Sequence, residues 1–246
     1  MKAVDLKNLL LVPFAGCAEL DESLQRLAGD QPDWFPSGYQ GLTIVDGGET
    51  LFAAVEEGRF YLSNSDALVP GYRPAEAFQS ALRNIKAGQP LSFREEYAIE
   101  TVWHEIMHSR TGIIATRRIL GQEPLEEGMI QFAARSTYGR LLTALDGADP
   151  AHQAAIIENG LAYPSVTRNL VELMRRAGLN GDRVEQILLQ HGPKWLEPLK
   201  AALSEGLNTK RAGSLLGQAA IKPLADFREK LDVQIRNAPL RNKESS

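Results

Sequence analysis

The strongest structural signal in this sequence is a helical segment with a clear start and a clear end. Ser92 and Glu95 have the spacing of a capping box, in which each side chain bonds the other residue's backbone N–H. Apolar residues then recur at helical spacing, namely Phe93, Tyr97, Val102, Trp103, Ile106 and Met107. Gly112 is suited to end the helix. The pattern predicts a helix of about 18 residues.

Residues 104–108 of this predicted helix read His-Glu-Ile-Met-His. Histidines four residues apart lie on one helix face, one turn apart, so both imidazoles can reach one Zn²⁺ at roughly 2.0–2.1 Å. Glu105 lies beside the first histidine, where a carboxylate can take a proton from an activated water. We therefore predict a zinc site with His104 and His108 as ligands and Glu105 as general base. The alternative is a histidine pair on a helix face without metal.

Glu127 is the candidate third ligand. A second helix is predicted from Pro124, a residue favoured at the first helical position, to about Leu145, which places Glu127 in the first turn. Gly128 follows, and glycine inside a helix costs about 1 kcal/mol relative to alanine. We expect another backbone or the metal-binding helix to approach closely there. Glu126 is the rival third ligand.

These motifs, preceded by predicted strands at Leu42–Asp46, Leu51–Glu56 and Arg59–Ser63, resemble the gluzincins, zinc metallopeptidases with a His-Glu-x-x-His helix and a glutamate on the next helix. Eighteen residues separate His108 from Glu127, as in the aminopeptidase-type branch. The resemblance covers roughly residues 40–145. The stretch from Glu127 is also similar to uncharacterised bacterial and phage-encoded gluzincin-like proteins, which often carry Thr and Glu at the positions of Ile130 and Gln131 here. The exopeptidase signature Gly-x-Met-Glu-Asn is absent, so aminopeptidase activity is not implied.

The resemblance implies a zinc-dependent endopeptidase whose partner is a peptide or protein substrate. Gluzincins usually stabilise the oxyanion with a Tyr or His that follows the third ligand. Tyr163, ahead of a predicted helix, is the preferred catalytic candidate, with His191 and His152 as alternatives, while Tyr138 is expected to pack. The competing function is a zinc-stabilised structural or interaction protein, associated with a phage or mobile element, without turnover. Hydrolysis of a non-peptide amide is a third possibility.

Two further residue roles follow from the zincin layout. The strand Arg59–Ser63 is a candidate sheet edge beside the cleft, where an extended substrate could pair by main-chain hydrogen bonds. The alternative is an inner strand with Phe60 and Leu62 in the core. Glu100, four residues before His104, could orient its imidazole, but a surface carboxylate is the favoured interpretation.

The expected fold is α+β: a zincin-like core over residues 1–145 with a small N-terminal sheet, then a C-terminal helical subdomain over 146–236 and a disordered tail at 237–246. Helices are predicted at about 75–86, 151–158, 165–177, 181–191, 194–204 and 212–236, while 20–40 is expected to be rich in loops.

The composition is that of an ordinary globular protein, with 246 residues, 43% hydrophobic and 24% charged residues, and a net charge of −4. No basic stripe indicates nucleic-acid binding, and no apolar run could span a membrane. The single cysteine, Cys17, excludes an intrachain disulfide. The preceding apolar run Leu9–Phe14 faintly resembles a lipoprotein signal, but a buried strand or helix is favoured, and we expect a cytoplasmic protein. The sequence does not predict the oligomeric state.

Overall fold

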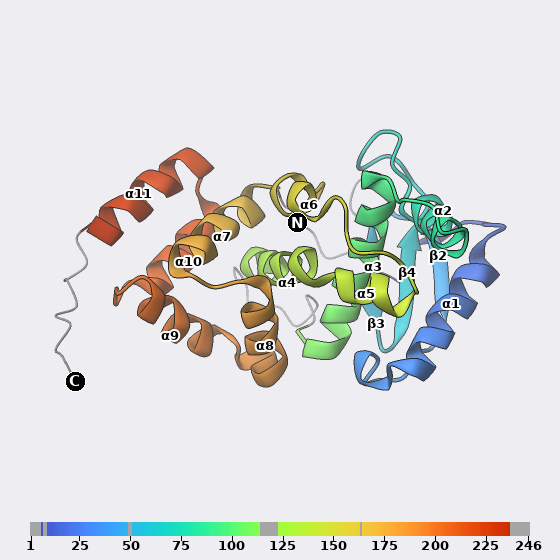
Figure 1. Cartoon of the computed structure of the whole chain (residues 1–246), viewed down its shortest axis with the longest axis horizontal. Coiled ribbons are helices and arrows are strands. Elements are labelled where there is room, and N and C mark those ends of the chain that lie inside the picture. Colours follow the sequence, from blue (N-terminus) through green and yellow to red (C-terminus); the bar gives the residue numbers. More distant parts are fainter. Residues whose placement is uncertain (1–5, 7–8, 49–50, 114–122, 163, 237–246) are drawn as a thin grey trace.

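The computed structural model describes residues 6, 9–48, 51–113, 123–162 and 164–236. Over these ranges the chain has an α+β fold, with a small mixed sheet from the N-terminal part and helices through the remainder (Figure 1). The predicted tail at 237–246 lies outside the described residues. None of the helices described here has the length and apolar character needed to cross a membrane.

The sheet has the strand order β1 (Leu10–Leu11), β2 (Leu42–Asp46), β4 (Arg59–Ser63), β3 (Ala53–Glu56). The β2 and β4 strands are parallel, and the two outer pairs are antiparallel. The strands predicted at Leu42–Asp46 and Arg59–Ser63 are confirmed, and the one predicted at Leu51–Glu56 is present but begins at Ala53. Leu10 and Leu11 form a strand as well, but their side chains are 68% and 67% exposed, so the prediction that this run is buried is wrong.

The interpretation of Arg59–Ser63 as an edge strand is wrong. A tight turn at Glu57 and Gly58, both with positive φ, folds β3 back onto one side of β4, while β2 bonds its other side. Phe60 and Leu62 are buried, as expected of an inner strand. The edge on this side of the sheet is therefore β3, which packs on the helix that carries His104 and His108.

That helix, α3 (Phe93–Thr111), lies between the sheet and the C-terminal helices (Figure 1). The predicted capping box is present, because Ser92 N donates to Glu95 Oε2 at 2.7 Å and Ser92 Oγ accepts from Glu95 N at 3.4 Å. Gly112 ends the helix in the left-handed conformation, with φ of 63°. Every residue from Glu95 to His108 is buried, so α3 forms the centre of the core.

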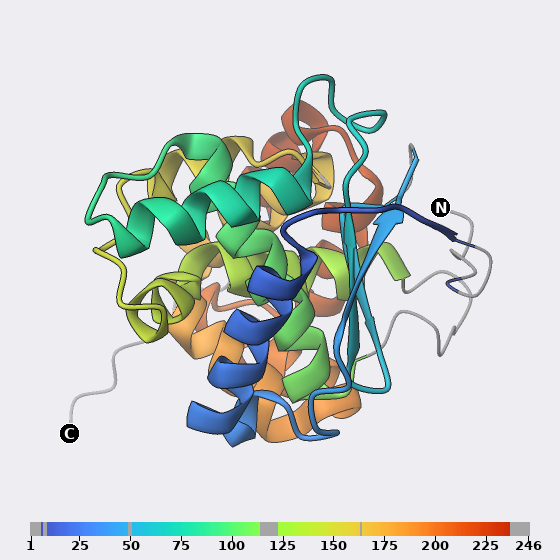
Figure 2. The same ribbon diagram turned by 90° about the vertical axis from the view of Figure 1, so that its right-hand side faces the viewer.

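Helices α2, α4, α5 and α8 pack directly on α3. Figure 2 shows α1 and α2 on the same side of the sheet as α3. The helices other than α3 are α1 (Cys17–Asp30), α2 (Pro74–Lys86), α4 (Glu123–Thr137), α5 (Gly139–Ala144), α6 (Gln153–Asn159), α7 (Pro164–Ala177), α8 (Gly181–His191), α9 (Leu196–Gly206), α10 (Ala212–Ile221) and α11 (Leu224–Arg236), with short 3₁₀ turns at Pro32–Trp34 and Gly192–Lys194.

Three predictions about where helices begin and end were wrong. The loop-rich prediction for 20–40 missed α1, which buries Leu20, Leu24 and Leu27 on one face. The helix predicted from Pro124 to Leu145 is divided at Tyr138 into α4 and α5. The long C-terminal helix is divided before Leu224, because a proline at 223 cannot donate an intrahelical hydrogen bond.

Candidate metal centre

The structure brings together the three side chains predicted to bind a metal. His104 Nε2 and His108 Nε2 lie 2.9 Å apart, and Glu127 Oε2 lies 3.4 Å from the first and 3.5 Å from the second. These three residues form a group, among the described residues, that could hold a metal ion. Glu126, the rival ligand, is not a member of that group.

The spacing of these atoms suits one small ion. Four ligands at roughly 2.0–2.1 Å around a tetrahedral ion stand about 3.3 Å from one another. The observed separations of 2.9, 3.4 and 3.5 Å lie close to that edge length. Two imidazole nitrogens and one carboxylate oxygen are also the donor set of catalytic zinc sites, which leave one coordination position to water or substrate. The residues present therefore fit Zn²⁺.

Local helix geometry and packing position the three groups. The histidines lie one turn apart on α3, and Glu127 is in the first turns of α4. A Cβ added at Gly128 would lie 2.6 Å from Val166 Cγ1 and 2.9 Å from Leu170 Cδ1, both on α7. The predicted close approach is present, but the approaching element is α7 rather than a backbone segment or α3. Glycine at this position lets α7 pack closely on α4 next to Glu127.

Glu105 is close to the group without joining it. Its Oε1 lies 4.0 Å from His104 Nε2, and the residue is 7% exposed. Burial raises the pKa of Glu105, against the opposing effect of the two histidines and of a hydrogen bond with the Val55 backbone on the edge strand β3. A buried carboxylate with a raised pKa beside a metal site is suited to accept a proton and release it again.

His108 has an acceptor for its second ring nitrogen. Its Nδ1 lies 2.6 Å from the carbonyl oxygen of Ile113. The left-handed conformation of Gly112 turns the chain so that this carbonyl faces back toward the helix. Burial alone would lower the pKa of His108, but Glu127, with Glu105 and the Ile113 carbonyl, raises it to about 9 in the metal-free protein.

A row of buried polar side chains lies next to the group of His104, His108 and Glu127, between α3 and the segment from α4 to Tyr138. We call it the polar seam; its members are Glu96, Glu100, Gln131, Arg135 and Tyr138. Gln131 Nε2 donates to Glu100 Oε1 at 2.5 Å, and Tyr138 OH donates to Glu96 Oε2 at 2.5 Å. The interpretation of Glu100 as a surface carboxylate is wrong, since the residue is 0% exposed. Burial raises the pKa of Glu100 to about 7, against the charges of Arg135 and His104.

Among the described residues, those proposed to stabilise the oxyanion lie in different parts of the structure. Tyr163 lies outside the described residues, so its role stays a prediction. The His152 ring packs on Phe93 and its Nε2 contacts the Leu91 carbonyl at 3.2 Å. At 1.5 Å per residue, the start of α3 is roughly 16 Å from His104, too far for contact with the same substrate atom. His191 is exposed at the end of α8. Tyr138 packs in the core, as expected.

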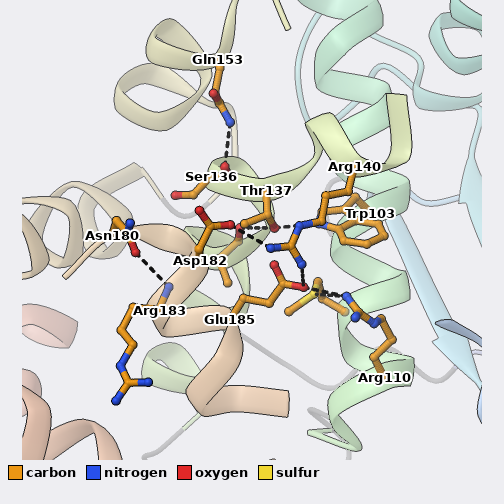
Figure 3. A network of polar contacts seen from close by, with 12 residues as sticks. Trp103, Arg110, Ser136, Thr137, Arg140, Gln153, Asn180, Asp182, Arg183 and Glu185 are labelled. Carbon is orange, nitrogen blue, oxygen red and sulfur yellow. Dashed lines mark hydrogen bonds and ion pairs between the residues drawn. The ribbon is translucent and has the colours of Figure 1, made fainter. Parts of the chain in front are cut away.

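An ion-pair cluster that the sequence did not predict holds α8 against α3 and α5 (Figure 3). Glu185 on α8, which is 1% exposed, accepts from Arg110 of α3 at 2.7 Å and from Arg140 of α5 at 2.8 Å. The Arg110 guanidinium also lies 5.3 Å from the ring centroid of Trp103. This cluster fixes the end of α3 that carries His108.

Comparison of the chain with protein-family models, curated proteins and solved structures found no match.

Proposed function

We propose that this protein is a zinc-dependent metallopeptidase that hydrolyses internal peptide bonds. One observation carries the proposal: a second acidic group, Glu105, is buried with its Oε1 4.0 Å from His104 Nε2, beside a complete His104–His108–Glu127 ligand set. A structural metal site needs ligands only. A hydrolytic site also needs a base that is not itself a ligand.

Zinc, when bound, acts as a Lewis acid on the scissile carbonyl and makes water more acidic. The Glu105 carboxylate accepts a proton from the attacking water and then donates it to the nitrogen of the leaving amine. Burial raises the pKa of Glu105 above that of an exposed carboxyl, which favours proton uptake and suits this double role. His104, His108 and Glu127 would hold the ion through two imidazole nitrogens and one carboxylate oxygen.

The edge strand β3 supports a peptide substrate. In the described part of the sheet, β3 pairs with β4 on one side and is last in the strand order. Its residues Ala53–Glu56 are half-buried, and the Val55 backbone lies beside Glu105. An extended substrate that paired with β3 would place a peptide carbonyl next to the general base. This arrangement agrees with a zincin-like fold and the gluzincin resemblance, with Tyr163 as the proposed oxyanion donor.

The alternative function, a zinc-stabilised structural or interaction protein, is favoured by one observation. His104, Glu105 and His108 are each 7% exposed, which would suit a closed structural site. The two functions differ in what Glu105 does, because a structural site would not use a base.

Elemental mass spectrometry and a peptide-library cleavage assay test the proposal together. We expect about one zinc per chain in the wild type and in Glu105→Gln, and strong loss of zinc in His108→Ala and Glu127→Ala. Glu126→Ala is the matched control, since it removes the neighbouring carboxylate on the same helix. Peptide cleavage should persist in the control and fall at least 10²-fold in Glu105→Gln.

Two results would refute the proposal. A wild type without zinc after metal supplementation would remove the metal centre. A Glu105→Gln variant with full cleavage activity would remove the mechanism. Zinc binding that raises thermal stability, with no cleavage of any peptide by the wild type, would favour the structural alternative.

A further inference from the structure

The two metal-binding histidines differ in how their second ring nitrogens are satisfied. A histidine that binds a metal through Nε2 carries its proton on Nδ1, and in metalloproteins that N–H is almost always donated to a carboxylate, carbonyl or water. His108 has the Ile113 carbonyl at 2.6 Å. His104 Nδ1 is buried and has no hydrogen-bond partner among the described residues.

A buried acceptor without a partner lies one helical turn away. Glu100 Oε2 is also buried and, within the described part of the chain, accepts no hydrogen bond. Glu100 and His104 are four residues apart on α3, so their Cβ atoms are neighbours on one face at about 5–6 Å. Helical side chains lean toward the N-terminus, which directs His104 back over Glu100. Each side chain has available the group that the other needs.

The other oxygen of Glu100 is already fixed. Gln131 Nε2 donates to Glu100 Oε1 at 2.5 Å from the facing helix α4. Gln131 is one turn after Glu127, so the helix that supplies the third ligand also clamps the carboxylate behind the first. A buried carboxylate with one free oxygen is costly unless that oxygen gains a donor. The Nδ1–H of a metal-binding His104 is such a donor.

We propose that Glu100 is a positioning residue for the metal centre: its Oε2 accepts the Nδ1–H of His104 and fixes the imidazole with Nε2 toward the ion. The inference rests on the proposed zinc site. Rotation of the Glu100 carboxylate, or one bridging water, would complete the hydrogen bond. Glu100 then links His104 to Gln131, on the helix that carries Glu127.

Zinc affinity, measured by competition with a chromogenic chelator at fixed pH, tests this role. Glu100→Met removes the acceptor and should weaken binding by about 10- to 100-fold. Glu100→Gln keeps an acceptor oxygen but loses its charge, so it should lose about fivefold. Glu96→Gln is the matched control, because Glu96 is a buried carboxylate one turn earlier that bonds Tyr138 and the amides of residues 151 and 152. This control should destabilise the fold and leave zinc affinity within twofold of the wild type.

Long-range ¹H–¹⁵N NMR of the zinc-loaded protein gives a second readout. We expect a strongly downfield, exchange-protected Nδ1–H signal for His104 in the wild type that moves upfield in Glu100→Gln. The His108 Nδ1–H, bonded to Ile113, should stay in place and serves as an internal reference. Wild-type zinc affinity in Glu100→Gln, together with an unmoved His104 signal, would overturn the inference while leaving the zinc site intact. A wild type that binds no zinc would instead overturn the proposed function.

Discussion

Gly128 offers a quantitative test of how α4 is held beside the metal group. In Gly128→Ala, the new methyl group would lie 2.6 Å from Val166 Cγ1 and 2.9 Å from Leu170 Cδ1, well inside van der Waals contact. Overpacking of this kind costs about 1–3 kcal/mol. Alanine regains about 1 kcal/mol of helix propensity. The free energy of unfolding should therefore fall by up to about 2 kcal/mol.

Gly217→Ala is the matched control for this substitution. Gly217 is an exposed glycine within α10, and an added Cβ there meets no atom within 4 Å. The control should raise the free energy of unfolding by up to about 1 kcal/mol. Because helix propensity contributes to both variants, the difference between them isolates the steric cost, about 1–3 kcal/mol. Urea unfolding followed by circular dichroism measures both values.

A double-mutant cycle identifies the clashing partner. Val166→Ala removes the nearest atom, Cγ1, so Gly128→Ala should cost about 1 kcal/mol less in that background than in the wild type. Zinc affinity should follow the same order as stability, because Gly128, which α7 contacts, is the chain neighbour of Glu127. A Gly128→Ala variant as stable as Gly217→Ala, with unchanged zinc affinity, would refute the close packing of α7 on α4.

Two further predictions concern charge. Glu185→Gln should lower the free energy of unfolding by about 3 kcal/mol in the urea assay, because it leaves Arg110 and Arg140 without a buried carboxylate. The control Asp182→Asn removes an equally short but exposed ion pair with Arg140 and should cost less than about 1 kcal/mol. Equal effects of the two substitutions would contradict the importance of burial. The pKa of His108 is raised from 6.5 to about 9 without metal, so zinc must displace a proton from His108 at lower pH. Zinc affinity, measured by chelator competition, should therefore rise by about tenfold per pH unit between about pH 6 and 8. An affinity that does not change with pH would contradict this prediction. The same shift stabilises the metal-free fold fully below pH 6.5 and is lost as pH rises through about 9.

The sequence predicted the features that depend on local signals. The capping box at Ser92, the stop at Gly112 and the histidine spacing are all encoded within one helix, and the structure confirms that helix. The close approach at Gly128 was also predictable, because a mid-helix glycine costs free energy that packing must offset. Its partner on α7 was not, since nothing in the sequence pairs Gly128 with Val166.

The wrong predictions concern contacts between distant segments. Whether β3 or β4 is the edge depends on which strand β2 joins, and sequence pattern does not encode strand order. Glu100 was assigned to the surface because a helix normally has a polar face toward solvent. Here α3 is surrounded on all sides, so its polar residues from Glu95 to His108 are buried as well. The Glu185 cluster joins residues 45 and 75 positions apart, beyond any local signal.

The packing of α7 on Gly128 also bears on the order of events during synthesis. A nascent chain that has reached residue 145 already contains His104, Glu105, His108 and Glu127, but the helices that hold α4 against α3 have not yet been made. The α7 contact at Val166 and the α8 clamp at Glu185 come only from residues translated later. The candidate metal site would therefore be assembled only after α7 and α8 have been translated and have docked.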